Sequence, residues 1–305
     1  MKGTRRLRRL LAGEQRGFLA RDRENWGDHL SRVRAFLGAG LAASGCRPAL
    51  ILGAGAGLEI PWAAAPRGTM GWDADPWSRA WTLLRHHRWA PWCFEDLTGG
   101  LADLDDLARR CLRQPWGRGL ERPRDRAIRR LAALLASARP WPRHLELRLA
   151  ELRPGAVLSA NVLGQLGVVA QRLLEFHLGP WPWILFPRGE DPVSEALEEW
   201  IAHAVRAQLK VLAASAAPLW LIHDRAVIHG SQDVSLGPLR EPWEEQLEGG
   251  GSAELEDALA GVDVRAELQL AAPGRELLRH ERWLWPVAPG QLHLVEAVAL
   301  GPPTG

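Results

Sequence analysis

Short apolar runs alternate along this chain with stretches in which apolar residues recur at helical spacing. The runs predict buried strands, and five of them lie at 48–52, 68–72, 89–94, 155–163 and 218–222. Helical spacing between the runs predicts helices at 76–84, near 168–176 and at 193–214. Continuous apolar runs are typical of parallel strands that helices cover on both faces. The pattern therefore predicts an α/β fold with a mostly parallel sheet.

Other segments complete or interrupt this alternation. Two further runs at 281–286 and 292–300, joined by a Pro-Gly turn at 288–291, predict a C-terminal antiparallel hairpin and bring the sheet to seven strands. Helical segments at 101–112 and 124–138 predict a helical insertion over about 101–152. Its apolar stripes need a partner, so we expect it to pack on the main domain of 48–300. Residues 245–254, with three consecutive glycines, predict a flexible loop.

Residues 1–47 predict an N-terminal helical cap. Trp26, Leu30, Val33 and Leu37 fall on one helical stripe, and most of the excess basic charge lies within residues 1–34. Either this is an amphipathic helix with a solvated basic face, or the basic face contacts RNA or an acidic membrane. The formal charge of the whole chain is only +2, which gives no reason to expect nucleic acid over the rest of the surface.

Composition limits the classes of protein further. With 305 residues and 47% apolar content, the chain can bury one large core. No apolar run approaches the eighteen or so residues that a membrane span needs, and the N-terminus lacks the apolar segment of a signal peptide. We therefore expect no membrane span and a cytoplasmic location.

The most informative motif is a glycine turn after the first predicted strand. Gly53, Gly55 and Gly57 alternate there, and Asp73 ends the second predicted strand. Glycine lets a ligand approach the backbone at the carboxyl edge of a parallel sheet, and an acid at the next strand end can accept hydrogen bonds from ribose hydroxyls. A dinucleotide fingerprint needs a glycine where this chain has Leu58, which disfavours a nicotinamide oxidoreductase. A nucleoside without a pyrophosphate fits better.

The order of these motifs resembles that of the class I S-adenosylmethionine-dependent methyltransferases. Four stretches carry the resemblance, at 52–57, 71–73, 94–97 and 158–163, and it covers about 48–300 with the insertion unmatched. It implies a Rossmann-like, doubly wound sheet and S-adenosylmethionine as the cofactor.

Residue by residue, the resemblance implies a cofactor site. The three glycines of the turn would line the cofactor, Asp73 would bind ribose, and Asp96 with the Leu97 backbone would bind adenine. Ser159 and Asn161 would face the methionine part and the acceptor, and Asn161 is the candidate catalytic residue. Many family members carry an acid two positions before the first glycine, where this chain has Ile51, and Glu59 is the candidate replacement.

Structural readings of the same residues stay open. The glycines can form a plain tight turn, Asp73 can cap the turn before Pro76, Asp96 can be a solvated loop acid, and Asn161 can fix its own loop. Asp73 and Asp75 also match the DxD pattern that holds a divalent cation on a nucleotide-sugar. His223, Asp224 and His229 form a conceivable metal site, but no compact third ligand is evident and we expect no metal.

We therefore expect methyl transfer from S-adenosylmethionine to a small-molecule acceptor, with the N-terminal helices and the insertion covering the acceptor site. The alternative is a non-catalytic, methyltransferase-like scaffold that binds a nucleoside or a partner protein. The replacement of the usual acid by Ile51 keeps this alternative open.

Overall fold

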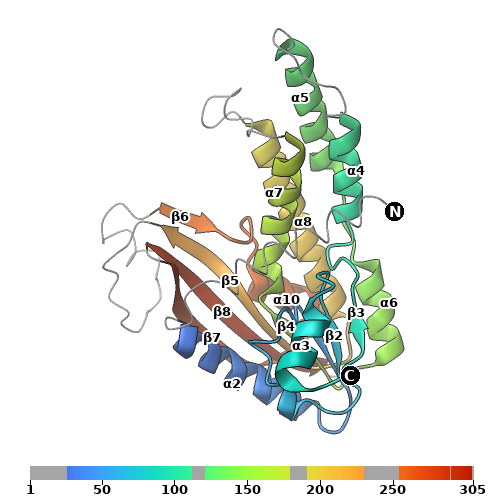
Figure 1. The fold of residues 1–305 in the computed structure, drawn as a ribbon, viewed down its shortest axis with the longest axis vertical. Helices are drawn as coiled ribbons and strands as arrows, with labels where there is room; N and C mark the ends of the chain where they lie inside the picture. The colour runs from blue at the N-terminus through green and yellow to red at the C-terminus, as the bar shows by residue number, and fades with distance from the viewer. Residues whose placement is uncertain (1–25, 112–120, 179–190, 230–253, 289, 304–305) are drawn as a thin grey trace.

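A computed structural model describes residues 26–111, 121–178, 191–229, 254–288 and 290–303. Its centre is one eight-stranded sheet in the order β3-β2-β1-β4-β5-β8-β7, with β6 paired to β5 (Figure 1). Five strands are mutually parallel: β1 (Ala49–Leu52), β2 (Met70–Trp72), β3 (Trp92–Cys93), β4 (Ala156–Ala160) and β5 (Leu219–His229). The antiparallel strands are β6 (Glu254–Asp257), β7 (Arg275–Ala288) and β8 (Gln291–Pro303). The expected α/β class, mostly parallel sheet and C-terminal hairpin are thus confirmed.

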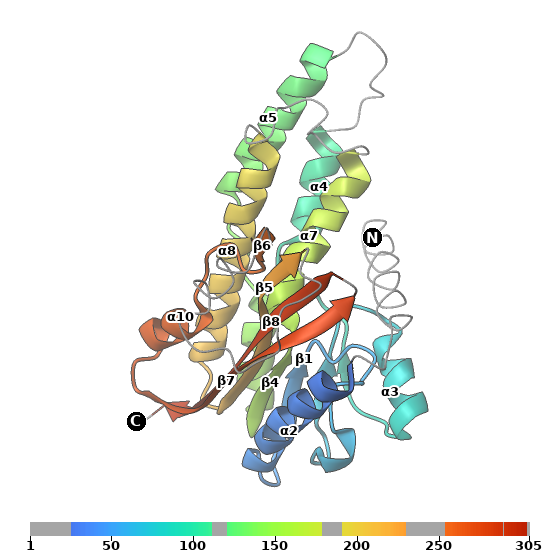
Figure 2. The same ribbon diagram turned by 90° about the vertical axis from the view of Figure 1, so that its left-hand side faces the viewer.

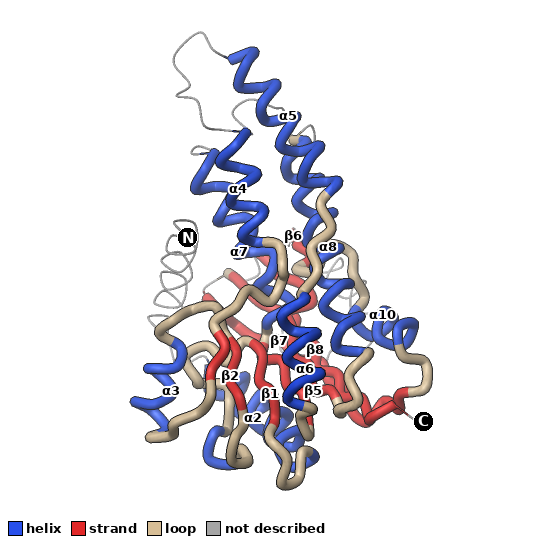
Figure 3. Tube along the Cα trace, turned by 90° about the vertical axis from the view of Figure 1, so that its right-hand side faces the viewer, coloured by secondary structure: helices blue, strands red, loops and turns tan. Residues whose placement is uncertain are grey.

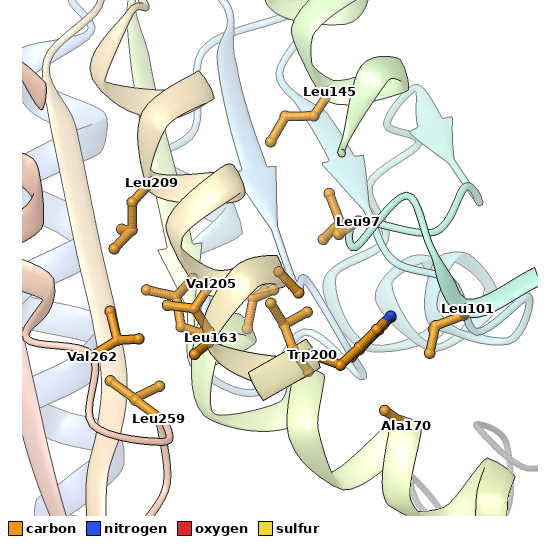
Figure 4. Packing of buried hydrophobic residues seen from close by; sticks show 14 of the residues in the cluster. Leu97, Leu101, Leu145, Leu163, Ala170, Trp200, Val205, Leu209, Leu259 and Val262 are labelled. Atoms are coloured by element: carbon orange, nitrogen blue, oxygen red, sulfur yellow. The ribbon is translucent and has the colours of Figure 1, made fainter. Parts of the chain in front are cut away.

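Helices cover both faces of this sheet. The described helices are α2 (Gly27–Ala43), α3 (Ser78–His86), α4 (Leu101–Cys111), α5 (Glu121–Ser137), α6 (Arg143–Leu152), α7 (Val162–Leu178), α8 (Pro192–Ala213) and α10 (Val264–Ala271), with a short 3-10 helix η2 (Trp62–Ala64). Successive residues of the central strands point to opposite faces. Leu50 and Leu52 of β1 therefore join the core under α8, whereas Ile51 joins the core under α2. Figure 4 shows the first of these cores, where Leu163, Val205 and Leu209 interdigitate.

Helix α2 belongs to the layered fold. It packs against β4 and β5, and Trp26, Val33 and Leu37 of the predicted stripe are buried while Leu30 is partly buried. Most of the predicted basic segment, residues 1–25, lies outside the described residues.

Four helices form an extension beyond the carboxyl edge of the sheet. The connection from β3 to β4 rises through α4 and returns through α5 and α6, and the connection from β4 to β5 rises through α7 and returns through α8 (Figures 2 and 3). Helices α4, α5, α8 and α7 contact one another in that cyclic order. The insertion expected at 101–152 therefore packs largely on α7 and α8, and we call the four helices the helical extension.

Several predicted boundaries were wrong. Strand β3 has two residues in place of the predicted run at 89–94, β5 continues seven residues past 222, and the sheet has eight strands because β6 pairs with that continuation. Helix α7 begins at Val162, which was assigned to a strand. The sequence analysis did not predict α6. The loop expected at 245–254 lies almost wholly outside the described residues.

Buried polar groups fix the C-terminal hairpin to β5. Glu296 of β8 lies opposite His223 of β5 and Arg282 of β7, and its carboxylate also contacts His280 Nε2 at 2.7 Å. Burial would raise the pKa of Glu296, but the contacts with His223, His280 and Arg282 outweigh it and hold the pKa well below its usual range. Arg275, at the start of β7, donates to the carbonyls of Ala217 and Gly301. It therefore links the start of β7 to the end of β8 and to the segment just before β5.

Within the described residues, no helix combines the length and apolar character needed to cross a membrane.

Candidate functional site

A cavity of about 430 Å³ opens at the carboxyl edge of the sheet, where the strand order reverses between β1 and β4. Open α/β sheets bind ligands at such a reversal because the connections from the two strands diverge there. The wall on one side is the turn after β1 with Asp73 and Asp75, and on the other it is a face of α7 and the ends of β5, β7 and β8. Figure 2 shows α7 rising from this edge beside the hairpin.

The glycine turn lies at the cavity and is held from several directions. Gly53, Gly55 and Gly57 all line the cavity and have positive φ angles of 65°, 48° and 74°. Arg85 and His86, at the end of α3, contact the carbonyls of Ala56 and Gly57, each at 2.9 Å. The turn is therefore a preformed element. Nothing in the sequence analysis singled out Arg85 for this role, because its partner is a backbone atom 29 residues away.

Gly53 has a structural reason to be glycine. A Cβ built there would lie 2.2 Å from Val162 Cγ2 and 2.7 Å from the Ala160 carbonyl oxygen. The turn thus passes directly over the end of β4, and this close approach alone requires glycine at position 53.

Asp73 links the end of β2 to the glycine turn. One carboxylate oxygen accepts from Gly55 N at 2.8 Å, and the other accepts from Asp75 N at 2.8 Å. The Ser78 side chain is a further donor. A carboxylate offers about four lone-pair positions, so these three donors leave room for one more. Asp73 can therefore cap the turn that follows β2 and still accept a hydrogen bond from a ligand.

Burial raises the pKa of Asp73 to about 6, although the two backbone donors oppose this rise. Asp73 is thus mostly ionised at pH 7, and it accepts hydrogen bonds best in that form. Asp75 is buried beside it, and its carboxylate accepts from Trp77 N at 3.0 Å near the start of α3. Within the described part of the chain, no group of three or more His, Cys, Asp or Glu residues is placed to hold a metal ion.

Glu59 lines the cavity, and its carboxylate lies 3.5 Å from His29 Nε2 of α2. His29 stacks on Trp285 of β7 with ring centroids 3.8 Å apart and accepts from Trp283 Nε1. Helix α2 therefore supports the cavity wall from behind. Ile51, at the position of the usual family acid, is fully buried in the core under α2.

Asn161 joins the ends of β4 and β5. It adopts a left-handed backbone with φ of 50°, and its side-chain amide donates to Asp224 Oδ2 at 2.8 Å while its oxygen accepts from Asp224 N at 2.9 Å. Both residues line the cavity. Asn161 thus fixes a neighbouring strand rather than only its own loop, and it positions the carboxylate of Asp224.

Three residues predicted for the site do not line the cavity. Asp96 caps α4, because its carboxylate accepts from the Thr98 hydroxyl and from the amides of Gly100 and Leu101. Leu97 is buried in the core. Ser159 has no exposed surface and lies within β4 between β1 and β5. The structure therefore brings together the glycine turn, Glu59, Asp73 and Asn161, but not these three.

Sequence reasoning also missed His293 and misjudged Asp224. His293 Nδ1 lies 3.1 Å from Asp224 Oδ2. The expected grouping of Asp224 with His223 fails because adjacent strand residues point to opposite faces. His223 instead pairs with Glu296, 3.2 Å away on the other side of the sheet. The alternation of side chains along β5 could have shown from the sequence that His223 and Asp224 lie on opposite faces of the sheet.

Neither the models of known protein families nor the sequences of curated proteins match this chain. Its function therefore has to be argued from the cavity and the residues around it.

Proposed function

We propose that this protein is an S-adenosylmethionine-dependent methyltransferase that acts on a small-molecule acceptor in the cavity. The observation that carries the proposal is Asp73, a carboxylate at the end of β2 that both fixes the glycine turn and faces a cavity at the reversal of strand order. This is the arrangement that the resemblance to class I methyltransferases implies for a ribose-binding acid. The C-terminal antiparallel hairpin agrees with the same resemblance.

The residues around the cavity fit the cofactor's chemistry. Asp73 has room for a ribose hydroxyl, and the backbone around Gly55 and Gly57 lets a ligand approach closely. Glu59 is placed to receive the positively charged amino group of the methionine part, in the role that an acid at position 51 has in many family members. We assign no ligand contact to Asp96, Leu97 or Ser159.

When bound, S-adenosylmethionine supplies a methyl group that its sulfonium charge has already activated. The protein then needs mainly to align the acceptor with this group and to exclude water. The wall of α7 and the β7–β8 hairpin are placed for this exclusion, since they close the cavity on the side away from the glycine turn.

The alternative is a scaffold that binds a nucleoside without transferring a group. The observation that favours it is the buried, apolar Ile51. Both functions require the cofactor-binding half of the cavity, and only the first consumes the cofactor. A release of S-adenosylhomocysteine that depends on an added acceptor separates them.

Titration calorimetry with S-adenosylmethionine tests the shared part of the proposal, with NADH and UDP-glucose as control ligands. We expect saturable one-to-one binding of S-adenosylmethionine alone. Asp73→Asn keeps the size of the side chain and removes its charge, so we expect affinity to fall about tenfold or more.

Asp263→Asn is the matched control. Asp263 also accepts a backbone hydrogen bond, from Ala266 N at 2.8 Å at the start of α10, but it does not line the cavity. We expect wild-type affinity in this variant. Equal affinity in the Asp73 and Asp263 variants, or no binding by the wild-type protein, would contradict the proposal.

A further inference from the structure

A buried carboxylate oxygen lies in the half of the cavity away from the glycine turn. Asp224 lines the cavity with only 7% of its surface exposed. Its Oδ2 accepts from Asn161 Nδ2, but its Oδ1 has no hydrogen-bond partner among the described residues. Buried polar atoms are nearly always paired, so an unpaired oxygen beside a cavity points to a donor from outside the described residues, which a ligand in the cavity can supply.

Asp224 is charged in this position. Burial by itself would raise its pKa, but the contact with His293 and the hydrogen bond from Asn161 hold the pKa below its ordinary value. An ionised carboxylate with a free buried oxygen is costly unless a strong donor meets it. A positively charged donor meets that need better than a neutral one, because charge-assisted hydrogen bonds are about twice as strong.

The rest of the cavity also favours a cation. Carboxylates of Glu59, Asp73, Asp75 and Glu256 line it together with Asp224. The one arginine among the described lining residues, Arg172, donates to Glu175 at 2.8 Å. The lining therefore carries an excess of negative charge, which attracts positively charged ligands.

Apolar surface lies beside the Asp224 carboxylate. Val227 of β5 and Val168 and Val169 of α7 line the cavity, and each has exposed surface. A ligand that places a charged nitrogen at Asp224 can therefore bury an aromatic or aliphatic body against these side chains.

We propose that Asp224 binds the protonated amine of a small apolar molecule, and that this amine is the methyl acceptor. The first half of the proposal concerns binding alone. The second half rests on the proposed methyltransferase function.

Methyl transfer requires the amine in its neutral form. The ammonium first loses one proton to solvent water, which leaves a neutral nitrogen with a lone pair while Asp224 stays ionised. The nitrogen forms a bond to the methyl carbon while the carbon–sulfur bond breaks, and the sulfur keeps the electron pair of that bond. The methylated amine leaves with the positive charge that the sulfonium carried.

Matched pairs of amine and alcohol test the binding half without any need to know the natural acceptor. The probes are 2-phenylethylamine against 2-phenylethanol and tryptamine against tryptophol, titrated into the full chain at pH 7, with and without S-adenosylhomocysteine. In each pair the apolar body is the same and only the charged nitrogen differs. We expect the wild-type protein to bind each amine about tenfold or more tightly than its alcohol.

Two variants test whether Asp224 causes the preference for amines. Asp224→Asn can still accept from Asn161 but has lost its charge, so we expect the preference for amines to disappear. Asp263→Asn removes a carboxylate that does not line the cavity, and we expect the preference to remain. The comparison within the wild-type protein does not depend on either variant folding.

Equal binding of amine and alcohol, no binding of either amine, or an undiminished preference in Asp224→Asn would each overturn the proposal. Its failure is distinguishable from failure of the proposed function. Wild-type binding of S-adenosylmethionine with no amine preference would overturn only the acceptor assignment, whereas amine preference without S-adenosylmethionine binding would overturn the methyltransferase function.

Discussion

At the scale of single residues, Asp73 fixes the glycine turn, and the proposed function gives it a second role in ligand binding. Its carboxylate orders the glycine turn through Gly55 N, and the same burial that makes this contact possible raises its pKa to about 6. A group that titrates near neutral pH makes ligand binding depend on pH, because ribose hydroxyls donate to the ionised form.

We predict that S-adenosylmethionine binding weakens as pH falls through 6. Since the pKa of Asp73 in the free protein is about 6, binding that requires the ionised form is about tenfold weaker at pH 5 than at pH 7. Calorimetry across this range measures the effect. Asp73→Asn should bind weakly at both pH values with no such dependence, and an equally steep dependence in this variant would assign it to another group.

A comparison of Gly53 with Gly45 tests the close approach of the glycine turn to its neighbours. Both have positive φ, 65° and 61°, but a Cβ at Gly45 meets no atom within 4 Å, whereas one at Gly53 meets β4. We predict that Gly45→Ala lowers the free energy of unfolding by about 1 kcal/mol, from backbone strain alone. Gly53→Ala should lower it by about 3 kcal/mol, because overpacking adds to the strain. Urea unfolding measures both, and equal losses would show that the turn does not press on β4.

Several residues that line the cavity could be predicted from the sequence because their signals are local. A glycine turn directly after an apolar run, with an acid about twenty residues later, needs no long-range contact to be recognised. Asp96 illustrates the limit, since a capping acid and a ligand-binding acid have the same sequence context and only the geometry of α4 separates them. His293 had no local signal, because its partner Asp224 lies on another strand.

At the scale of elements, the β7–β8 hairpin forms the cavity wall and is held by a buried ionic cluster. Glu296 accepts from Arg282 on β7 and contacts His223 on β5, so one carboxylate ties three strands together. The sequence predicted a hairpin but not its full length. The predicted hairpin starts at 281, whereas β7 starts at Arg275, because residues 275–280 carry no strand pattern of their own and become a strand by pairing with β8.

We predict that Glu296→Gln lowers the free energy of unfolding at pH 7 by about 2 kcal/mol, because the Arg282 guanidinium remains beside a neutral side chain. The folded-state pKa of Glu296 lies below its unfolded value. Its contribution to stability is therefore present above pH 4.5 and is lost as pH falls below that value. Denaturant unfolding at pH 7 and in acid should show that the variant and the wild type converge in acid. A constant difference between them would contradict this account of the cluster.

At the scale of the whole molecule, the two longest connections between parallel strands both leave from the carboxyl edge and pack on each other as the helical extension (Figure 1). Their apolar periodicity predicted helices, but not that α4 and α5 would pack on α7 and α8, because helical spacing identifies a buried face and not its partner. One consequence is that α7 serves both as a bundle helix and as a wall of the cavity.

The most direct test of the central claim locates the cofactor on the chain. Ultraviolet cross-linking of S-adenosylmethionine that carries a tritiated methyl group, followed by peptide mapping, reports which residues lie beside the reactive end of the ligand. We predict that the label is displaced by S-adenosylhomocysteine and lies in peptides that contain the glycine turn at 53–59, the start of α7, or the ends of β5 and β8. Displaceable label confined to any other part of the chain, or no displaceable label, would contradict the assignment of this cavity as the methyltransferase site.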